Sequence, residues 1–436
     1  FNRMIGLNRV ADVPYRILYL VQPDRGLVDD VIRREIGRAA EDIVVVDPMA
    51  GGGSIPLEAL RLGLKTVAIE YNPVAYLILK ATLDYPAKYG MRLYEGVKVE
   101  AERLIRWAQK ELGKYYPEDA LNYIFARGYK CPSCGGLIPI IHGTRLGKNG
   151  PYIKFTFNKK SKTFNVKISS VETSFMRLRC PYCSTPIVRE TALKDWVSRH
   201  KRLLDLALSG DLRVAKNSID ELIQTHIPLI KQTEEGFKPT SREDIDRFID
   251  AYLDLTRLAK DLKEVILSSP IPKKENEVFK SITDFGIEYW YELFNPRQLL
   301  ILLQLINYVR NRVKKLCLDK SELGAAIAIY LSFGLSKLAN FNNIANHWDY
   351  TMGKGSIDNI MWGYASGRKV KFSLEYCEMP PIVVDPHKSL GWVFEFDIER
   401  PTATRGGLCP VVKYLCSWIG GLDDRIKVFM ADAVNL

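Results

Sequence analysis

The sequence has few histidines, little glutamine and no long apolar run, and each scarcity narrows what the protein can do. The longest apolar stretch, residues 299–309, is interrupted by Gln304 and Asn307 and is too short to cross a bilayer, so we expect no membrane span. No secretory signal is visible. Only five histidines are present, and His347, which lies among asparagines and aromatic residues, receives no catalytic role. Scarce glutamine beside plentiful lysine and glutamate is a weak indication of a thermophile.

Size and charge set broad limits on the fold and on the partners. The chain has 436 residues, 47% of them hydrophobic, which is enough to bury a large core in two or three domains and gives no sign of disorder. It carries 62 basic and 51 acidic residues, a formal net charge of +11. This excess favours a polyanionic partner, although many enzymes with other substrates are as basic.

Half of the eight cysteines lie in two close pairs, Cys131-Pro-Ser-Cys134 and Cys180-Pro-Tyr-Cys183. This spacing is typical of metal knuckles rather than of disulfides, so we expect a protein of the reducing cytoplasm. Four sulfur ligands would make a closed, structural zinc site. The alternative is that the two pairs are unrelated surface features. The other cysteines show no such spacing and are expected to be buried free thiols: Cys317, Cys377, Cys409 and Cys416.

Two stretches of alternating apolar and polar residues lie between the cysteine pairs, at residues 153–158 and 164–168. They predict the strands of a hairpin around residues 159–162, and the hairpin and the cysteine pairs together predict a zinc ribbon. The lysines at the tip of this hairpin could contact a phosphate backbone, but a solvated hairpin end is the more frequent arrangement.

Residues 43–63 read as a buried strand, a glycine turn and the start of a helix in direct succession. The strand residues are β-branched, as in a parallel strand covered on both faces, and Asp47 ends the run. Gly51, Gly52 and Gly53 permit positive φ and leave the backbone open to a ligand. We expect Ser54 to cap the helix. We interpret the turn as a cofactor cradle; the alternative is an ordinary turn of an α/β protein with a capped helix.

A second short strand follows this helix and ends in an acid, Glu70. Glu70 lies where the ribose of a bound nucleotide would present its hydroxyl groups. A nicotinamide enzyme shares this plan, but its fingerprint requires a third glycine three residues after the second, and this chain has Pro56 there. The pattern therefore favours a different nucleotide cofactor.

Asp47-Pro-Met-Ala-Gly-Gly-Gly53 followed by Glu70-Tyr-Asn-Pro73 resembles the cofactor motifs of S-adenosylmethionine-dependent methyltransferases, particularly the DNA enzymes that methylate amino groups. The resemblance implies that the loop holds the methionine end of the cofactor and that Glu70 holds its ribose. It also implies that an acid after the third strand, here Asp432, contacts the adenine amino group. The cofactor-binding residues that it implies are Asp47, Pro48, Met49, Ala50, Gly51, Gly52, Gly53, Glu70, Tyr71, Asn72, Asp432 and Ala433.

Further segments resemble a family of adenine-specific DNA methylases that carry a zinc ribbon. They are both cysteine pairs, Leu293-Phe-Asn-Pro-Arg-Gln-Leu-Leu300 and, more loosely, Leu374-Glu-Tyr-Cys-Glu-Met-Pro-Pro381. Within the first segment, Arg297 and Gln298 could contact nucleic acid or form an ordinary polar face. The asparagines at residues 340–350 could hydrogen-bond a flipped base, although asparagine turns at a helix end are more frequent.

The catalytic motif of the amino-methylating enzymes is missing. That motif is Asp, Asn or Ser, then Pro-Pro, then an aromatic residue, and the only Pro-Pro here, Met379-Pro-Pro-Ile382, has neither the polar residue nor the ring. No catalytic residue is therefore assigned. Three explanations are open: the sequence is incomplete, a second polypeptide completes the active site, or the chain has become a binding module. We expect the first, because an open sheet ending at a third strand would leave a hydrophobic edge.

These observations predict an α/β, Rossmann-like methyltransferase core, incomplete at its C-terminal side, with an inserted zinc ribbon and a helical insertion. Residues 1–120 would hold the first half of the core, 121–192 the ribbon, 193–275 the helical insertion, and 276–436 the return to the core. The expected function is methylation of adenine N6 in duplex DNA, with S-adenosylmethionine as cofactor. RNA methylation and a non-catalytic nucleic-acid-binding scaffold remain the alternatives. Helices are predicted at residues 28–36, 73–83, 96–112, 299–316 and 323–340.

Overall fold

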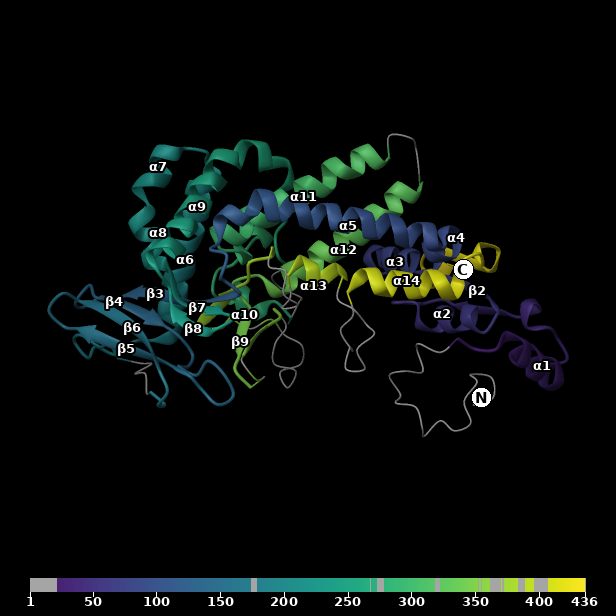
Figure 1. Cartoon of the computed structure of the whole chain (residues 1–436), viewed down its shortest axis with the longest axis horizontal. Coiled ribbons are helices and arrows are strands. Elements are labelled where there is room, and N and C mark those ends of the chain that lie inside the picture. Colours follow the sequence, from purple (N-terminus) through teal and green to yellow (C-terminus); the bar gives the residue numbers. More distant parts are fainter. Residues whose placement is uncertain are drawn as a thin grey trace. The chain divides into compact units, whose positions relative to one another are not determined.

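A computed structural model of the chain describes most of its residues. The described residues are 22–173, 179–266, 268–272, 278–317, 322–351, 353, 355–360, 370, 372–382, 389–395 and 407–435. They form a mixed α/β protein with several separate sheets (Figure 1). This confirms the predicted α/β class in its coarse form.

The contacts group the chain into two compact units. Unit 1 contains residues 1–104, 309–334 and 392–436, and unit 2 contains residues 105–308 and 335–391. Each is described by itself below. The division into four segments stays a prediction, because compact packing alone does not show which parts fold independently.

Unit 1 contains a parallel sheet of three strands in the order β1-β2-β12. The strands are β1 (Val44–Asp47), β2 (Lys65–Glu70) and β12 (Ile426–Met430), and β12 pairs with β2 although residues 71–425 separate them in sequence. A strand near the last residues was predicted to return to this sheet, and β12 is that strand. Within the described residues β1 pairs only with β2, so it forms an edge of this sheet.

The exposure of β1 corrects one expectation. The strand was expected to be covered on both faces, but Val44 and Val46 are 52% and 57% exposed. The reason is that the core of unit 1 packs on the opposite face, so the described residues leave these two valines open to solvent. The other face is covered, and it carries the core of unit 1. The fully buried residues of this core are Leu60, Ala68, Leu79, Leu83, Ala87 and Ile419.

Short helices connect and cover the strands of unit 1. Helix α2 (Ser54–Arg61) joins β1 to β2, and α3 (Pro73–Leu79) begins with Asn72 as its cap and proline at its first position. The helix predicted at 73–83 continues instead as a π-helical turn (Lys80–Asp84) and α4 (Tyr85–Tyr89). The other helices with residues in this unit are α1 (Arg25–Ile36), α5 (Met91–Leu112), α11 (Pro296–Leu316), α12 (Glu322–Phe341), α13 (Leu390–Glu395) and α14 (Leu408–Ile419), of which α5, α11, α12 and α13 also contribute to unit 2.

Unit 2 is built around an antiparallel sheet of five strands. Its order is β11-β3-β7-β8, and β4 also pairs with β3. The strands are β3 (Asn122–Lys130), β4 (Leu137–Ile140), β7 (His226–Thr233), β8 (Gly236–Pro239) and β11 (Glu375–Glu378). Two smaller pairs are the predicted hairpin, β5 (Tyr152–Asn158) with β6 (Thr163–Ser169), and β9 (His347–Asp349) with β10 (Ser356–Asp358).

The helical insertion predicted at 193–275 is wrong in its middle. The helices α6 (Arg189–Leu208), α7 (Leu212–Asn217), α8 (Ile219–Thr225) and α9 (Arg242–Leu262) are present, but β7 and β8 lie between them. Pro228 cannot continue a helix, and Gly236, with φ +128°, turns the chain between the two strands. Every residue of β7 is buried, including its polar ones. The strand therefore lacks the alternation of apolar and polar residues by which a strand is recognised in a sequence. Unit 2 also contains the short helix α10 (Lys280–Asp284).

Candidate cofactor cradle and metal centre

The glycine turn leads directly from β1 into α2. Gly53, with φ +83°, is the cap residue of α2, and Ser54 is the first helical residue. The prediction that Ser54 caps this helix is therefore wrong, and no side chain caps its start. The amide of Gly53 instead donates to the carbonyl of Ala50 at 2.8 Å, which closes a tight turn. Glycine adopts this left-handed conformation at little cost, which explains its presence here.

The space beside the turn differs from one glycine to the next. A β-carbon at Gly51 or Gly52 would meet no atom within 4 Å, whereas one at Gly53 would come within 2.8 Å of Cδ2 of Leu79. The turn is thus packed against the core at its end and open at its start. Met49, just before the open part, is 79% exposed. The open backbone has the form that the cradle interpretation requires.

Glu70 joins this turn to the end of β2. One carboxylate oxygen accepts a hydrogen bond from the amide of Gly51 at 2.8 Å, and the other accepts from the amide of Asn72 at 2.9 Å. These bonds stabilise the charged form and lower the pKa of Glu70, with the bond from Asn72 contributing most. The side chain of Asn72 in turn accepts from the amide of Val74 at the start of α3. One carboxylate therefore bridges the two loops predicted to form one site.

The three predicted acids lie at the carboxyl ends of the three strands. Asp47 is the last residue of β1 and pairs with Ala68, while Glu70 is the last residue of β2 and pairs with Met430. Because alternate residues of a strand share a face, Asp47 and Glu70 lie on the same side of the sheet. Asp432 follows β12 by two residues, and the amide just before it donates to the carbonyl of Glu70 at 3.2 Å. The fold brings these acids to one edge of the sheet; their binding roles stay predictions.

The other predicted cradle residues lie around this edge. Pro48, Met49 and Ala50 form the start of the turn, and the amide of Ala50 donates to the carbonyl of Ile69 at 3.0 Å. Tyr71 follows Glu70 with its side chain 74% exposed. Ala433 opens a single turn of helix (Ala433–Asn435) after Asp432, whose carboxylate accepts from the amide of Val434.

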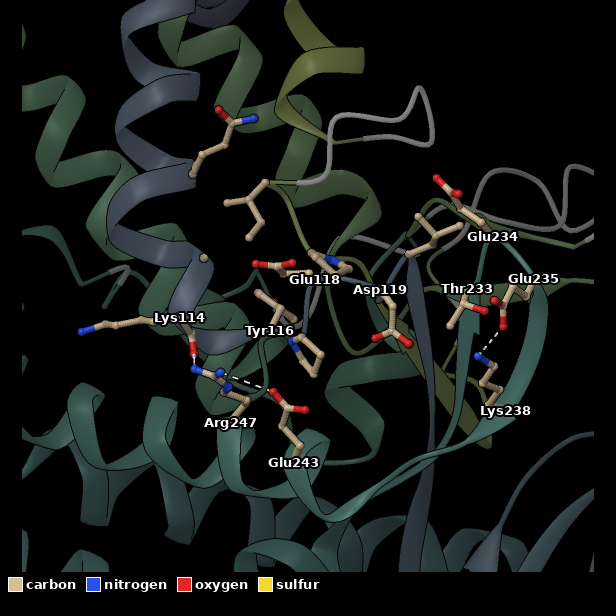
Figure 2. Close-up of a pocket in the computed structure, with 16 residues that line it drawn as sticks. Lys114, Tyr116, Glu118, Asp119, Thr233, Glu234, Glu235, Lys238, Glu243 and Arg247 are labelled. Atoms are coloured by element: carbon tan, nitrogen blue, oxygen red, sulfur yellow. Dashed lines mark hydrogen bonds and ion pairs between the residues drawn. The ribbon is translucent and has the colours of Figure 1, made fainter.

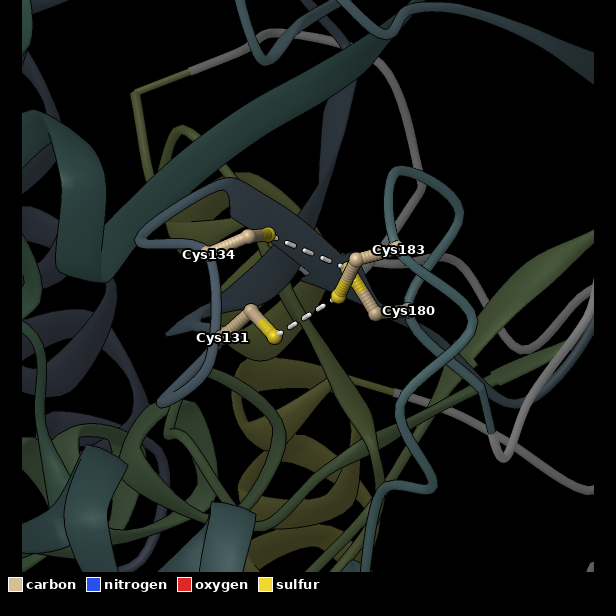
Figure 3. A group of neighbouring side chains, drawn as sticks. All are labelled: Cys131, Cys134, Cys180 and Cys183. Carbon is tan, nitrogen blue, oxygen red and sulfur yellow. Dashed lines mark hydrogen bonds between the residues drawn. The ribbon is translucent and has the colours of Figure 1, made fainter.

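The four cysteines of the two pairs come together in unit 2 (Figure 3). Their Sγ atoms all lie within 4.8 Å of one another, with 3.6 Å between Cys131 and Cys183 and 3.7 Å between Cys134 and Cys180. A tetrahedral ion with zinc–sulfur bonds of about 2.3 Å would hold its sulfurs about 3.8 Å apart. All four are free thiols. The group can therefore hold a metal ion and is compatible with structural zinc.

The two cysteine pairs share one backbone hydrogen-bond pattern. The amide of Gly135 donates to the carbonyl of Cys131 at 2.8 Å, and the amide of Ser184 donates to the carbonyl of Cys180 at 2.9 Å. Both donors are left-handed, with φ +71° and +63°. Gly135 after the first cysteine pair predicted a turn there. Ser184 has the equivalent place after the second pair, and its residue type gave no signal for a left-handed turn. The two knuckles therefore have the same backbone turn after the second cysteine, although their sequences differ.

The thiols of the second pair differ in their proton affinity. The hydroxyl of Thr185 lies 3.2 Å from Sγ of Cys183, and this hydrogen bond lowers the pKa of Cys183 to about 6. Burial raises the pKa of Cys180 to about 12. The thiolate is the form that binds metal, so Cys183 is the more readily available ligand of this pair.

Arg297 and Gln298 are buried in unit 2, with exposed fractions of 0% and 2%. Nε of Arg297 donates to Glu378 at 2.6 Å, and Glu378 also accepts from Asn295 at 2.7 Å and from the hydroxyl of Tyr116 at 2.7 Å. Neither Arg297 nor Gln298 is placed to touch a nucleic acid from this interior position. Sequence spacing could not show this, because the partner carboxylate lies on β11, far along the chain.

The asparagines that could have bound a flipped base also serve the interior. Asn342 accepts from the amide of Met379 at 3.0 Å, and Asn346 exchanges hydrogen bonds with the backbone of Cys377, accepting at 2.7 Å and donating at 2.8 Å. Asn346 is fully buried. These side chains fix β11 against the end of α12, so the ordinary structural interpretation holds for them.

Unit 2 also has a cavity of about 1200 Å³ near the end of α5, the start of α9 and the β7–β8 turn (Figure 2). Five carboxylates and three cationic side chains line it, and some pair with one another, as Arg247 does with Glu243 and Lys238 with Glu235. The excess of negative charge disfavours a phosphate ligand there. No sequence pattern marked its charged residues, because segments distant in sequence build the cavity.

No protein-family model, curated protein or solved structure matches this chain. Among the described helices, α12 alone has the length and apolar content of a membrane span, and half of that stretch is buried within the protein, as in many core helices.

Proposed function

We propose that this chain carries the cofactor-binding part of an S-adenosylmethionine-dependent enzyme that methylates adenine N6 in DNA. The observation that carries the proposal is the hydrogen bond between Glu70 and the amide of Gly51. It links the glycine turn after β1 to the acid after β2, which are the two motifs that resemble those of the amino-methyltransferases. The three strands are parallel in the order β1-β2-β12, so Asp432, after β12, lies at the same sheet edge as the other two acids.

The donors and acceptors of this cradle suit the parts of S-adenosylmethionine. Carboxylates accept from hydroxyl and amino groups, so Glu70 would hold the ribose, Asp47 the cationic end and Asp432 the adenine amino group. The open backbone at Gly51 and Gly52 leaves room for a ligand to approach. The bound cofactor would supply an electrophilic methyl group for direct displacement. The residues of this chain would bind and orient it, and alignment of this kind accounts for much of the rate of such reactions.

We further propose that the cysteine cluster holds zinc as a structural ion in the cytoplasm. Four sulfur ligands leave no open coordination position, so the ion would stabilise the fold and take no part in the reaction. Metal analysis of the purified protein should find one zinc ion per chain. A Cys134→Ser variant should lose most of that zinc, whereas Cys317→Ser should keep it. Equal zinc contents in these two variants would contradict the proposal.

Titration calorimetry with S-adenosylmethionine tests the cofactor assignment. The wild-type chain should bind, and Asp47→Ala and Glu70→Gln should each weaken binding at least about tenfold, since each removes a charged hydrogen-bond acceptor. The matched controls Asp30→Asn and Glu95→Gln change exposed acids of the same unit and should bind as the wild type does. No binding by the wild type, or unchanged binding by folded Asp47 and Glu70 variants, would overturn the assignment and favour a non-catalytic scaffold.

Methyl transfer distinguishes the possible substrates. Tritium transfer from labelled cofactor to duplex DNA, compared with transfer to structured RNA, should be carried out with the full gene product. The proposal expects labelled N6-methyladenine in the DNA. Label only in the RNA would favour the alternative of an RNA methyltransferase, for which the basic charge of the chain is equally suitable.

A further inference from the structure

The hairpin of β5 and β6 has one polar and one aromatic face. Side chains alternate along each strand, so Lys154, Thr156 and Asn158 share the exposed face with their partners across the ladder. Those partners are Lys167, Asn165 and Thr163. The opposite face is less exposed and carries the rings of Phe155, Phe157 and Phe164, which pack on one another. The ring of Phe157 also packs on Tyr182 of the second knuckle. The hairpin therefore turns a polar sheet face to the surroundings.

The hairpin carries an unbalanced positive charge. Residues 151–170 contain five lysines and no acid. Lys154 pairs directly with Lys167 across the two strands, and like charges in that relation destabilise a hairpin. Among the described residues, no hydrogen bond or ion pair compensates these two side chains, nor those of Lys159 and Lys160 at the tip. A directly opposed, uncompensated lysine pair fits a site whose countercharge comes from a ligand.

The hairpin is also fixed in orientation relative to the cysteine cluster. Nζ of Lys162 donates to the carbonyl of Cys134, so the tip is fastened to the first knuckle. The side chain of Asn158 accepts from the amides of Lys160 and Ser161, which shapes the turn. One lysine thus anchors the tip while four remain directed to solvent. Two of these four lie on the strands and two at the tip, so positive charge extends along the hairpin and suits a polyanionic partner.

We propose that four lysines of the β5–β6 hairpin, Lys154 and Lys167 on the strands and Lys159 and Lys160 at the tip, bind the phosphate backbone of the nucleic acid that the enzyme modifies. The inference rests on the proposed function, because that function supplies a nucleic-acid substrate. A duplex strand presents one negative charge about every 3.4 Å, and lysines act on phosphates as point charges without sequence preference. The cavity in the same unit is unsuited to this contact, since carboxylates predominate on its walls.

Charge-matched variants of the zinc-loaded full chain test this assignment. The double variant K154Q/K167Q removes the opposed pair, and K159Q/K160Q removes the tip charges. The control K216Q/K263Q removes the same charge from two exposed lysines elsewhere in unit 2. Binding to short labelled DNA and RNA duplexes is followed by fluorescence anisotropy over a series of salt concentrations. Each hairpin variant should lose about tenfold or more in affinity at physiological salt, and the salt slope should become shallower by about 1.8 for two lost contacts.

The control should keep the affinity and slope of the wild type. Equal losses in the control and the hairpin variants would overturn the proposal, as would unchanged binding by the hairpin variants or no binding by the wild type. A merely structural role would lower the thermal midpoint of K154Q/K167Q, whereas relief of like-charge repulsion should leave it equal or raise it. Binding is measured without cofactor, so hairpin-dependent binding together with failed cofactor calorimetry would refute the enzyme proposal alone.

Discussion

Nδ1 of His200 lies 3.1 Å from Nε2 of His226, inside unit 2, and both rings are fully buried. Nε2 of His200 lies 2.9 Å from the carbonyl of Glu292 and must donate to it. In the neutral rings that burial favours, Nδ1 of His200 accepts from Nε2 of His226, whose Nδ1 accepts in turn from the hydroxyl of Tyr376 at 2.8 Å. Each neutral ring has one donor and one acceptor, so with both histidines uncharged every ring nitrogen has a partner.

This relationship predicts that stability falls in mild acid. Burial lowers the pKa of His200 to about 3 and that of His226 well below its usual value. The unfolded chain binds protons near pH 6.5 and the folded chain does not, so stability is complete above that pH and is lost as the pH decreases. The free energy of unfolding in urea should decrease by about 1.0 kcal/mol per histidine from about pH 6.5 to 5.5. A value unchanged over this range would contradict the buried, neutral assignment.

The buried pair of Arg297 and Glu378 predicts a large loss of stability on truncation. Both side chains are fully buried, with 2.6 Å between Nε and the carboxylate. Glu378→Ala would leave the guanidinium without its countercharge and should lower the free energy of unfolding by about 3–5 kcal/mol. Urea denaturation measures this, with the exposed Glu95→Ala as control, expected to stay within about 0.5 kcal/mol of wild type. A Glu378 variant as stable as the control would contradict the network.

The glycine turn predicts opposite results for two neighbouring substitutions. Gly52→Ala adds a methyl group in open space, so the fold should keep its thermal midpoint while S-adenosylmethionine binds more weakly. Gly53→Ala must adopt φ +83° and approach Leu79, so it should lower the free energy of unfolding by about 1–3 kcal/mol. Calorimetry and thermal unfolding of both variants separate the effects. If Gly52→Ala binds the cofactor as tightly as wild type, the ligand does not lie over this part of the turn.

The equivalence of the two knuckles predicts reciprocal effects at Gly135 and Ser184. Both positions have left-handed φ, which costs a residue with a β-carbon about 1–2 kcal/mol. Ser184→Gly should therefore retain zinc at higher chelator concentration than wild type, and Gly135→Ser should release it at lower concentration. A colorimetric zinc-release titration measures both midpoints. Shifts of the same sign in the two variants would show that the backbone conformation does not limit metal retention.

Local signals account for the parts of the molecule that the sequence predicted well. β-branched runs marked β1 and β2, the alternation of residues 153–168 marked the β5–β6 hairpin, and the spacing of the cysteines marked their cluster. Each of these features depends on residues close together in sequence, or on one motif used twice. The grouping of Asp47, Glu70 and Asp432 also followed, because carboxyl ends of parallel strands meet at one edge of a sheet.

The features that escaped prediction depend on tertiary contacts. β7 was assigned to a helical segment because its polar residues, such as Lys231 and Gln232, do not alternate with apolar ones, and burial on both sides removes the usual pattern. Arg297 was open to two interpretations because only its contact with Glu378 reveals that it is interior. The left-handed Ser184 has no sequence signal, since serine is usual in ordinary turns.

The chain passes repeatedly between the two units, and this limits which deletion variants can fold. The chain changes unit after residues 104, 308, 334 and 391, and those positions lie within α5, α11, α12 and α13. Neither unit is encoded by a continuous stretch of gene, so deletion mapping would cut through helices and expose apolar surface. Point substitutions in the intact polypeptide, rather than shortened fragments, are therefore the appropriate tools for assigning activities to its parts.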